Sequence, residues 1–486
     1  MIRTGQQYRD SLRDGREIWI NGERVNDPCT HPQIKPAVDA RAHIYDIQHD
    51  TKTKNAMSYE ENGESFAIGL RLPYEQKDWQ DKREAVDLVT HNLGGVVTRV
   101  GDETIGEMWS LWDGKDILNE IDPRFAENIE RHIHQAIKND PFHVSANTDP
   151  KGDRSKAPQD QDPDMLVHVV KETDAGIVIR GAKFETAAAY SNQAFLKPTI
   201  ANWGNSELSD YALGCIVKMD APGVKHICRS GFAGASGGCP RANQEDYPLA
   251  NKFDEIDTLM ILDDVLVPWE DVLFYQHTKA ASFIRATLHR YSAFPYVQRT
   301  LSYADLIIGA ALWNVKQTGL EKQQAVQEKL SELAVWREGI NAFLTAAIAT
   351  AEISPNGLLM PNQSLLFSGR VHALSNLPKM MHLARELCGG QICVTPDANT
   401  FAASETKPWM DKFYSINEKW LADDRRKLLA LARDLLNSDY AGHRLTFQLF
   451  AQSAPFAQLA AVYRNFDWDG PLDFAHKAAG LSDRMK

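Results

Sequence analysis

The hydrophobic pattern of this chain changes twice, and each change marks a candidate domain boundary. Up to about residue 137 the sequence favours helices, whereas residues 138–277 form short β-branched or alternating runs separated by Asp, Gly and Pro. Such runs are typical of an antiparallel sheet or barrel. The sequence therefore predicts an α+β fold with three domains: a mainly helical domain over 1–137, a β domain over 138–277 and a helical bundle over 278–486.

Several segments give clear local predictions. Residues 81–95 (DKREAVDLVTHNLGG) have apolar residues at helical spacing and end in two glycines, and residues 123–139 predict an amphipathic helix. The stretch 58–70 (SYEENGESFAIGL) is predicted as a loop. The tripeptide 174–176 (DAG) lies between two strand-like runs and predicts a hairpin. Residues 321–353 predict one long helix, which is typical of a bundle.

Composition and charge exclude several classes of protein. The net charge of −12 and the pI of about 5.7 argue against electrostatic binding to nucleic acid or to anionic membranes. The N-terminal residues lack the apolar core of a signal peptide, and no apolar run reaches the roughly 18 residues of a membrane span. Six cysteines in 486 residues are interpreted as reduced thiols. We therefore expect a cytoplasmic protein, and no metal site, because the close pair Cys388 and Cys393 matches no common metal motif.

A glycine-rich stretch at 229–249 (RSGFAGASGGCPRANQEDYPL) is the main candidate for a moving loop. It contains neither a GxGxxG motif before a helix nor a Walker pattern, so a phosphate-binding role is not favoured. Its glycines give the backbone freedom to move, and we interpret it as a lid that excludes water. A disordered surface loop is the alternative.

Four stretches, in this order and spacing, resemble one enzyme family. The chain is similar to the oxygenase component of the two-component, reduced-flavin-dependent aromatic monooxygenases, which include 4-hydroxyphenylacetate and chlorophenol hydroxylases and have an acyl-CoA dehydrogenase-like fold. The four stretches are YRDSLRDGREIWINGERVNDPCTHP (8–32), FHVSANTDPKGDRSK (142–156), KETDAGIVIRGAKFETAAAYSN (171–192) and YPLANKFDEIDTLMILDDVLVPWEDVLFY (247–275).

The resemblance implies a reaction, a cofactor and partners. Reduced FAD, supplied by a separate flavin reductase, would react with dioxygen to give a flavin hydroperoxide. Its electrophilic oxygen would hydroxylate an electron-rich phenolic or small heteroaromatic ring. No Rossmann motif for a nicotinamide occurs in the chain, which agrees with reduction elsewhere. The sequence does not select the aromatic substrate.

A dehydratase or acyl-CoA dehydrogenase of the same fold is the alternative enzyme. The 4-hydroxybutanoyl-CoA dehydratase branch holds an iron–sulfur cluster through three cysteines and a histidine, and such a cluster needs thiolates close together in space. Residues 90–110 contain no cysteine, and no cysteine partner follows His289 closely. The monooxygenase branch is therefore favoured.

The stretch from Lys138 to Arg154, with its Asp, Asn and Pro residues, is predicted to be irregular. In the family a histidine corresponding to His143 lies between flavin and substrate and hydrogen-bonds the substrate hydroxyl. An imidazole titrates near neutral pH and suits that role. Backbone groups left unpaired by an irregular loop would be free to bind a flavin. The resemblance assigns FAD contacts in this stretch to His143, Val144, Ser145, Asn147, Asp153 and Arg154, while a surface loop built of Asp and Asn turns is the alternative.

Arg99 and Glu103 are candidate substrate-binding residues by resemblance. Arg99 would hold the substrate and stabilise negative charge near the reacting oxygen, whereas a solvated arginine at a helix start is the alternative. The 4-hydroxyphenylacetate enzymes have an aromatic hydroxyl residue at the position of Glu103. A carboxylate there would repel an acidic substrate, which argues against 4-hydroxyphenylacetate itself.

Further positions follow from the resemblance alone. His289 would act as a base against the phenol, although a histidine on a helix surface is equally compatible with the sequence. The others are expected FAD or substrate contacts, with ordinary packing as the alternative. Thr186, Ala187, Phe447, Gln448 and Phe450 are expected at FAD, and Ala201 and Asn202 at the substrate.

The helix predicted over 321–353 has more apolar residues than one subunit easily buries. We therefore expect a homo-oligomer, and the resemblance implies a homotetramer.

Overall fold

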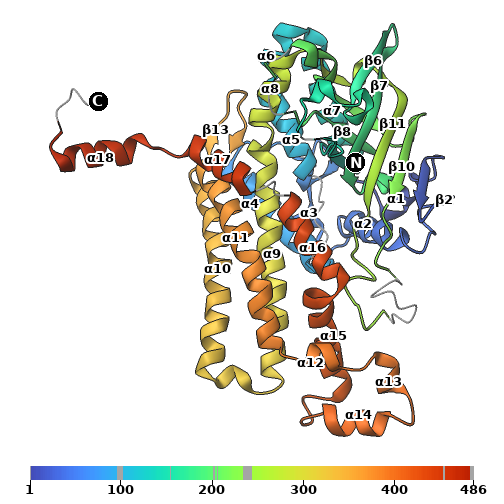
Figure 1. Ribbon diagram of the computed structural model, residues 1–486, viewed down its shortest axis with the longest axis vertical. Helices are drawn as coiled ribbons and strands as arrows, with labels where there is room; N and C mark the ends of the chain where they lie inside the picture. Colours follow the sequence, from blue (N-terminus) through green and yellow to red (C-terminus); the bar gives the residue numbers. More distant parts are fainter. Residues whose placement is uncertain are drawn as a thin grey trace.

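The computed structural model describes residues 2–95, 102–153, 155–200, 203–204, 206–233, 244–451 and 455–481. A helical bundle lies beside a β-rich half (Figure 1). The helices α9 (His289–Lys316), α10 (Gln324–Ala349) and α11 (Gln363–Cys388) pack against one another along the long axis. Helix α5 (Asp102–Asp113) contacts both α9 and strand β5 (His143–Ala146), so it joins the two halves.

The first part of the chain is rich in helices, as the sequence predicts. Helix α4 (Gln76–Asn92) ends before Gly94 and Gly95, which have φ values of 65° and 71°, in the left-handed region that favours glycine. The apolar face of α7 (Pro123–Asn139) buries Phe125, Ile129 and Ile133, which confirms the amphipathic helix. The other helices here are α1 (Gly5–Asp10), α2 (Lys35–Ile47), α3 (Lys54–Met57) and α6 (Lys115–Ile121).

The prediction of a loop over residues 58–70 is wrong. Strands β3 (Ser58–Glu61) and β4 (Glu64–Ala67) form a hairpin there. Its turn is Asn62-Gly63, with φ values of 52° and 81°. Asn-Gly is the dipeptide that two-residue hairpin turns favour, because both central residues need positive φ.

Two sheets form the β-rich half. The six-stranded sheet has the order β2-β1-β10-β11-β7-β6, and the four-stranded sheet has the order β12-β9-β8-β5. Thr173 pairs with Gly176 across the turn between β6 and β7, which confirms the predicted hairpin. The bounds are β1 (Glu17–Ile20), β2 (Glu23–Val25), β6 (His168–Thr173), β7 (Gly176–Thr186), β8 (Gln193–Leu196), β9 (Leu213–Lys218), β10 (Val224–Cys228), β11 (Asp257–Pro268) and β12 (Val272–Tyr275).

The sheets are mixed, whereas the sequence predicted antiparallel pairing. Strand β1 pairs with β10, and β5 with β8, in parallel. In both cases a long stretch of chain separates the partners, and a parallel pair needs such a connection. Strands β1 and β2 come from the region predicted to be helical, so the N-terminal segment contributes to the central sheet. The division into three domains stays a prediction.

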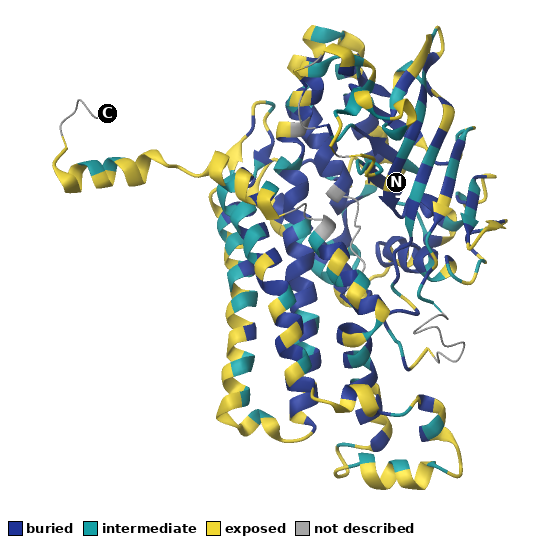
Figure 2. Cartoon of the chain, viewed as in Figure 1, coloured by how far each residue is buried: buried dark blue, intermediate teal, exposed yellow. Residues whose placement is uncertain are grey.

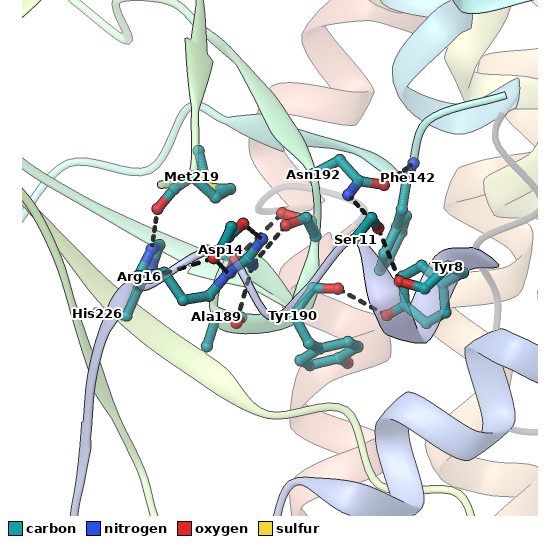
Figure 3. Close-up of polar contacts among 12 residues, drawn as sticks. Tyr8, Ser11, Asp14, Arg16, Phe142, Ala189, Tyr190, Asn192, Met219 and His226 are labelled. Atoms are coloured by element: carbon teal, nitrogen blue, oxygen red, sulfur yellow. Dashed lines mark hydrogen bonds and ion pairs between the residues drawn. The ribbon is translucent and has the colours of Figure 1, made fainter. Parts of the chain in front are cut away.

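Buried hydrogen bonds fasten the N-terminal segment to the chain before β8 (Figure 3). The Tyr8 hydroxyl donates to the backbone oxygen of Tyr190 at 2.6 Å, and Arg16 Nη1 donates to the backbone oxygen of Ser191 at 2.6 Å. Asn192 Oδ1 accepts a hydrogen bond at 2.9 Å from the backbone N–H that precedes β5. These contacts fix where β5 and β8 begin.

The C-terminal part is helical, and its helices differ in how far they are buried (Figure 2). Helix α9 is largely buried, whereas α10 has few buried residues and α18 is mostly exposed. The helix predicted over 321–353 is continuous only from Gln324 to Ala349. None of the helices in the described ranges is both long and apolar enough to cross a membrane. The remaining elements are α8 (Thr278–Thr287), β13 (Glu352–Ile353), β14 (Leu359–Met360), α12 (Gln391–Val394), α13 (Ala398–Ala402), α14 (Lys407–Tyr414), α15 (Ala422–Asn437), α16 (Asp439–Ala451), α17 (Pro455–Asn465) and α18 (Asp469–Ala479).

Candidate active site

Strands β5 and β8 carry most of the candidate site that the structure describes. His143 pairs with Gln193 and Ser145 with Phe195, and successive side chains of a strand point to opposite faces. His143 and Ser145 therefore lie on one face of the sheet, together with Gln193 and Phe195. The prediction that the chain is irregular from residue 138 is wrong at residues 143–146, which form strand β5 at the edge of the four-stranded sheet.

His143 is buried and is held by one neighbour. Its Nε2 atom lies 2.9 Å from Gln193 Nε2, while no described residue offers a hydrogen-bond partner to its Nδ1 atom. Burial, aided by the positive charges of His132 and Lys197, lowers the pKa of His143 to about 3. The imidazole is therefore neutral at physiological pH, unlike the freely titrating histidine that the sequence led us to expect.

A buried ion pair lies next to Ser145. Lys197 Nζ donates to Glu107 Oε2 and to Ser145 Oγ, both at 2.5 Å, and Ser145 Oγ donates to Glu107 Oε2 at 2.6 Å. All three side chains are buried. We call these three residues the Glu107 cluster. Sequence analysis missed Glu107 and Lys197, although a lone acid in the apolar segment IGEMWSLW was a signal.

His289 approaches the Glu107 cluster from the bundle. It is the first residue of α9, and its Nδ1 atom lies 3.1 Å from Ser292 Oγ and 3.9 Å from Glu107 Oε1. The structure therefore brings His289 and Ser145, which are 144 positions apart in the printed sequence, to the same carboxylate. His289 stays partly exposed, so it is accessible to a ligand.

A second polar group connects the six-stranded sheet to α16. Thr186 Oγ1 donates to Asp257 Oδ1 at 2.6 Å, and Asp257 Oδ2 lies 2.7 Å from both His443 Nε2 and Arg229 Nε. Burial alone would raise the pKa of Asp257, but the hydrogen bond with His443 and the charge of Arg229 lower it. Ala187 follows with φ at 72°, in the left-handed region, so the chain turns sharply after β7.

Aromatic and cationic side chains surround Phe447 and Gln448 on α16. The Phe447 ring lies 4.8 Å from the Arg444 guanidinium carbon and 5.5 Å from that of Arg299. Gln448 is buried, and both polar atoms of its amide lack a hydrogen-bond partner among the described residues. Arg370 is fully buried nearby against Tyr296, and burial lowers its pKa to about 10. Sequence analysis missed both Arg299 and Arg370.

The remaining predicted positions divide into two groups. Val144, Asn147 and Asp153 are described but do not join the Glu107 cluster. Val144 is buried. Asn147 Oδ1 accepts a hydrogen bond from Thr148 Oγ1 at 3.0 Å, and the exposed Asp153 accepts one from Ser155 Oγ at 2.7 Å. Several other predictions lie outside the described residues. These are Arg99, Arg154, Ala201, Asn202, the side chains of Glu103 and Phe450, and residues 234–243 of the glycine-rich stretch.

Within the described ranges, no group of three or more His, Cys, Asp or Glu side chains is placed to hold a metal ion. The five cysteines that are described, Cys29, Cys215, Cys228, Cys388 and Cys393, are all free thiols.

Comparison with known proteins places the chain in a family. Residues 4–274 match the 4-hydroxyphenylacetate 3-hydroxylase N-terminal family, and residues 279–480 match the C-terminal family of the same enzyme. The 4-hydroxyphenylacetate 3-monooxygenase oxygenase component of Thermus thermophilus is 27% identical over 471 residues, covering 96% of this chain and 95% of the relative. The 4-nitrophenol 2-monooxygenase oxygenase component of a Rhodococcus species is 29% identical, covering 92% of this chain and 85% of the relative.

Solved structures agree on the fold. The oxygenase component HpaB of 4-hydroxyphenylacetate 3-monooxygenase, in complex with FAD and 4-hydroxyphenylacetate, superposes with a TM-score of 0.90 at 26% identity and covers 98% of this chain and 99% of that one. A 4-hydroxybutyryl-CoA dehydratase from N. maritimus superposes with a TM-score of 0.89 at 24% identity, covering 99% of this chain and 96% of that one, which shows a shared fold alone. The fold therefore does not select the reaction, whereas the two family matches do. The chain belongs to the 4-hydroxyphenylacetate 3-hydroxylase family, and it is the oxygenase component of a reduced-FAD-dependent aromatic monooxygenase.

Proposed function

We propose that this enzyme hydroxylates an electron-rich phenolic or small heteroaromatic ring beside His143. In the overall reaction, one oxygen atom of dioxygen replaces a ring hydrogen as a hydroxyl group. The other leaves as water, and two electrons come from reduced FAD, which becomes oxidised. The observation that carries this proposal is the buried, neutral His143, whose Nδ1 atom has no partner among the described residues, in a chain whose family is that of aromatic hydroxylases.

His143 is proposed to act on the oxygen of the substrate. With the amide nitrogen of Gln193 facing Nε2, that ring nitrogen accepts, and the imidazole proton resides on Nδ1. A donating Nδ1–H stabilises negative charge on a phenol oxygen, which makes the ring richer in electrons and easier to oxidise. Desolvation strengthens this hydrogen bond, since the group is buried in a medium of low dielectric constant.

The residues around α16 fit FAD. The buried amide of Gln448, which has no partner among the described residues, and the buried guanidiniums of Arg299 and Arg370 suit the polar and anionic parts of a dinucleotide. Thr186 and Ala187, at the turn after β7, are proposed to meet the edge of the flavin ring. Bound reduced FAD supplies the electrophilic oxygen after it reacts with dioxygen. These residues position the cofactor and exclude water around it.

This enzyme is proposed to accept a narrower class of substrates than its family as a whole. Two relatives carry the names of 4-hydroxyphenylacetate and 4-nitrophenol enzymes, so the family accepts phenols with different second substituents. Glu103 is a substrate-binding position by resemblance, and a carboxylate there disfavours an anionic substituent on the ring. Neutral phenols and N-heteroaromatic rings are the favoured substrates.

We also propose a homotetramer. Exposed apolar side chains on the C-terminal helices, including Phe456, Leu472 and Phe474 at 77%, 65% and 76% exposure, support burial against further copies of the chain. Size-exclusion chromatography with light scattering would show one particle of about four times the 54.5 kDa chain mass. A monomer would contradict the proposal.

The hydroxylase activity can be tested with a generic flavin reductase, NADH, FAD and a panel of neutral phenols and N-heteroaromatic rings under air. We expect a hydroxylated product from at least one ring, with less hydrogen peroxide formed than in the absence of that ring. If every ring is returned unchanged and all reducing equivalents appear as hydrogen peroxide, the proposal is wrong.

A further inference from the structure

Glu107 has one carboxylate oxygen that the described residues leave without a partner. Its Oε2 atom accepts hydrogen bonds from Lys197 and Ser145, whereas its Oε1 atom accepts none from any residue that the structure describes. His289 Nδ1 lies 3.9 Å from Oε1, which is beyond hydrogen-bond distance. The side chain is completely buried. Because a buried acceptor without a donor is unfavourable, this oxygen indicates a group that binds from outside the chain.

Glu107 Oε1 and His143 Nδ1 belong to the same candidate site. Glu107 contacts Ser145, which shares a strand face with His143. Neither Glu107 Oε1 nor His143 Nδ1 has a hydrogen-bond partner among the described residues. A ligand that meets both must offer an acceptor to the Nδ1–H group of His143 and a donor to Glu107.

We propose that Glu107 is a substrate-binding residue whose Oε1 atom accepts a hydrogen bond from a second polar group on the aromatic ring, a neutral hydroxyl, amino or ring N–H donor. Lys197 is a positioning residue. It holds Oε2, neutralises the buried carboxylate and leaves Oε1 directed away from itself. This assignment rests on the proposed aromatic hydroxylation and adds to it the chemistry of the substituent that the enzyme selects.

Glu107 and Lys197 carry opposite charges and are both buried, so the variants must not leave either charge alone. Removal of Lys197 alone would leave a carboxylate buried without its counter-ion, and such changes are strongly destabilising. Replacement of both partners by apolar residues of similar size is far better tolerated. The Glu107→Leu/Lys197→Met double variant therefore removes the acceptor without leaving a lone charge. Lys82→Met is a matched control, because Lys82 is also a buried lysine but donates to the backbone oxygen of Ile68.

The test measures ligand binding, so it does not depend on turnover. Hydroquinone and resorcinol are compared with their monomethyl ethers, which keep one hydroxyl and lose the second donor. Dissociation constants are measured without oxygen, from changes in the absorbance of oxidised FAD bound to the protein. The wild type and Lys82→Met should bind at least one diphenol roughly ten- to hundred-fold more tightly than its ether, as expected for a hydrogen bond to a charged group. The double variant should bind both alike.

Two results would overturn the assignment: equal binding of diphenol and ether by the wild type, or a preference that survives in the double variant. If the double variant does not fold, Glu107→Gln replaces it and should lower the preference several-fold, since a neutral acceptor is weaker than a charged one. An unchanged preference in that variant would also overturn the assignment. A wild type that shows the Glu107-dependent preference but hydroxylates no ring would instead refute the proposed function and leave the recognition in place.

Discussion

The two ends of strand β8 use buried polar groups in opposite ways. Before the strand, the Tyr8 hydroxyl and the Arg16 guanidinium donate to backbone oxygens, and Asn192 accepts from the backbone, so these side chains serve the fold. After it, Lys197 and Ser145 hold one oxygen of Glu107, while the other oxygen has no partner among the described residues. At this strand, the degree to which hydrogen bonds are satisfied distinguishes the structural polar groups from the proposed ligand-binding ones.

The largest expected effect is on catalysis at His143, which pairs with the first residue of β8 and whose Nδ1 atom has no partner among the described residues. His143→Ala removes the proposed hydrogen bond to the substrate oxygen, and kcat/KM for hydroxylation should fall by roughly 10²–10⁴-fold. FAD titration of the variant should give a dissociation constant close to that of the wild type, which separates lost chemistry from lost cofactor. A variant that retains wild-type kcat/KM would remove His143 from the reaction.

At the start of β8, where the side chains serve the fold, a substitution should lower the stability of the protein and leave catalysis unchanged. Arg16→Met removes hydrogen bonds to two backbone oxygens and the partner of Asp14, with the side chain buried. We expect the free energy of unfolding to fall by about 3 kcal/mol, measured by denaturant titration.

The kcat of the folded fraction of Arg16→Met should stay within about two-fold of the wild type, because the contact fixes the start of β8 and touches no ligand. A large fall in kcat with stability unchanged would contradict the distinction between the two ends. Arg13→Met, at an exposed ion pair of the same segment, is the matched control and should change stability little.

The buried His143 also makes stability depend on pH. Burial lowers the pKa of His143 from 6.5 to about 3, so the unfolded chain binds a proton that the folded chain refuses between these values. Stability should therefore be full above about pH 6.5 and fall as the pH drops, by up to about 1.4 kcal/mol per unit, until the folded pKa is passed. His143→Gln should lose about 2 kcal/mol less than the wild type between pH 7 and pH 5, as measured by denaturant titration at each pH. Identical pH profiles would mean that His143 is not held neutral.

Sequence reasoning reached the local elements better than the site. The helix over 123–139 and the hairpin at 174–176 depend on neighbours within a few positions, and both were found. The hairpin at 58–70 was missed because its charged residues hid the Asn62-Gly63 turn. Glu107 and Lys197 are 90 positions apart, and their contact exists only once α5 packs on the four-stranded sheet.

The secondary structure at His143 shows the same limit. The tetrapeptide HVSA is too short, among Asp, Asn and Pro residues, to be recognised as a strand. It becomes one because β8 lies beside it, and only that pairing places Ser145 over Glu107. The resemblance identified His143 and Ser145 as site residues, whereas the hydrogen-bonding state of each side chain follows from tertiary packing.

The smallest expected effect tests the residue at the border of the two ends. Gln193 follows the structural residue Asn192 directly, yet its amide lies 2.9 Å from His143 Nε2. Gln193→Met should leave the free energy of unfolding within about 0.5 kcal/mol of the wild type. It should lower kcat about five- to ten-fold with KM little changed, because the imidazole loses the contact that fixes its orientation and tautomer. If instead Gln193→Met lowers stability and leaves kcat intact, the boundary between structural and catalytic polarity lies on the other side of Gln193, and the neutral imidazole is oriented by packing alone.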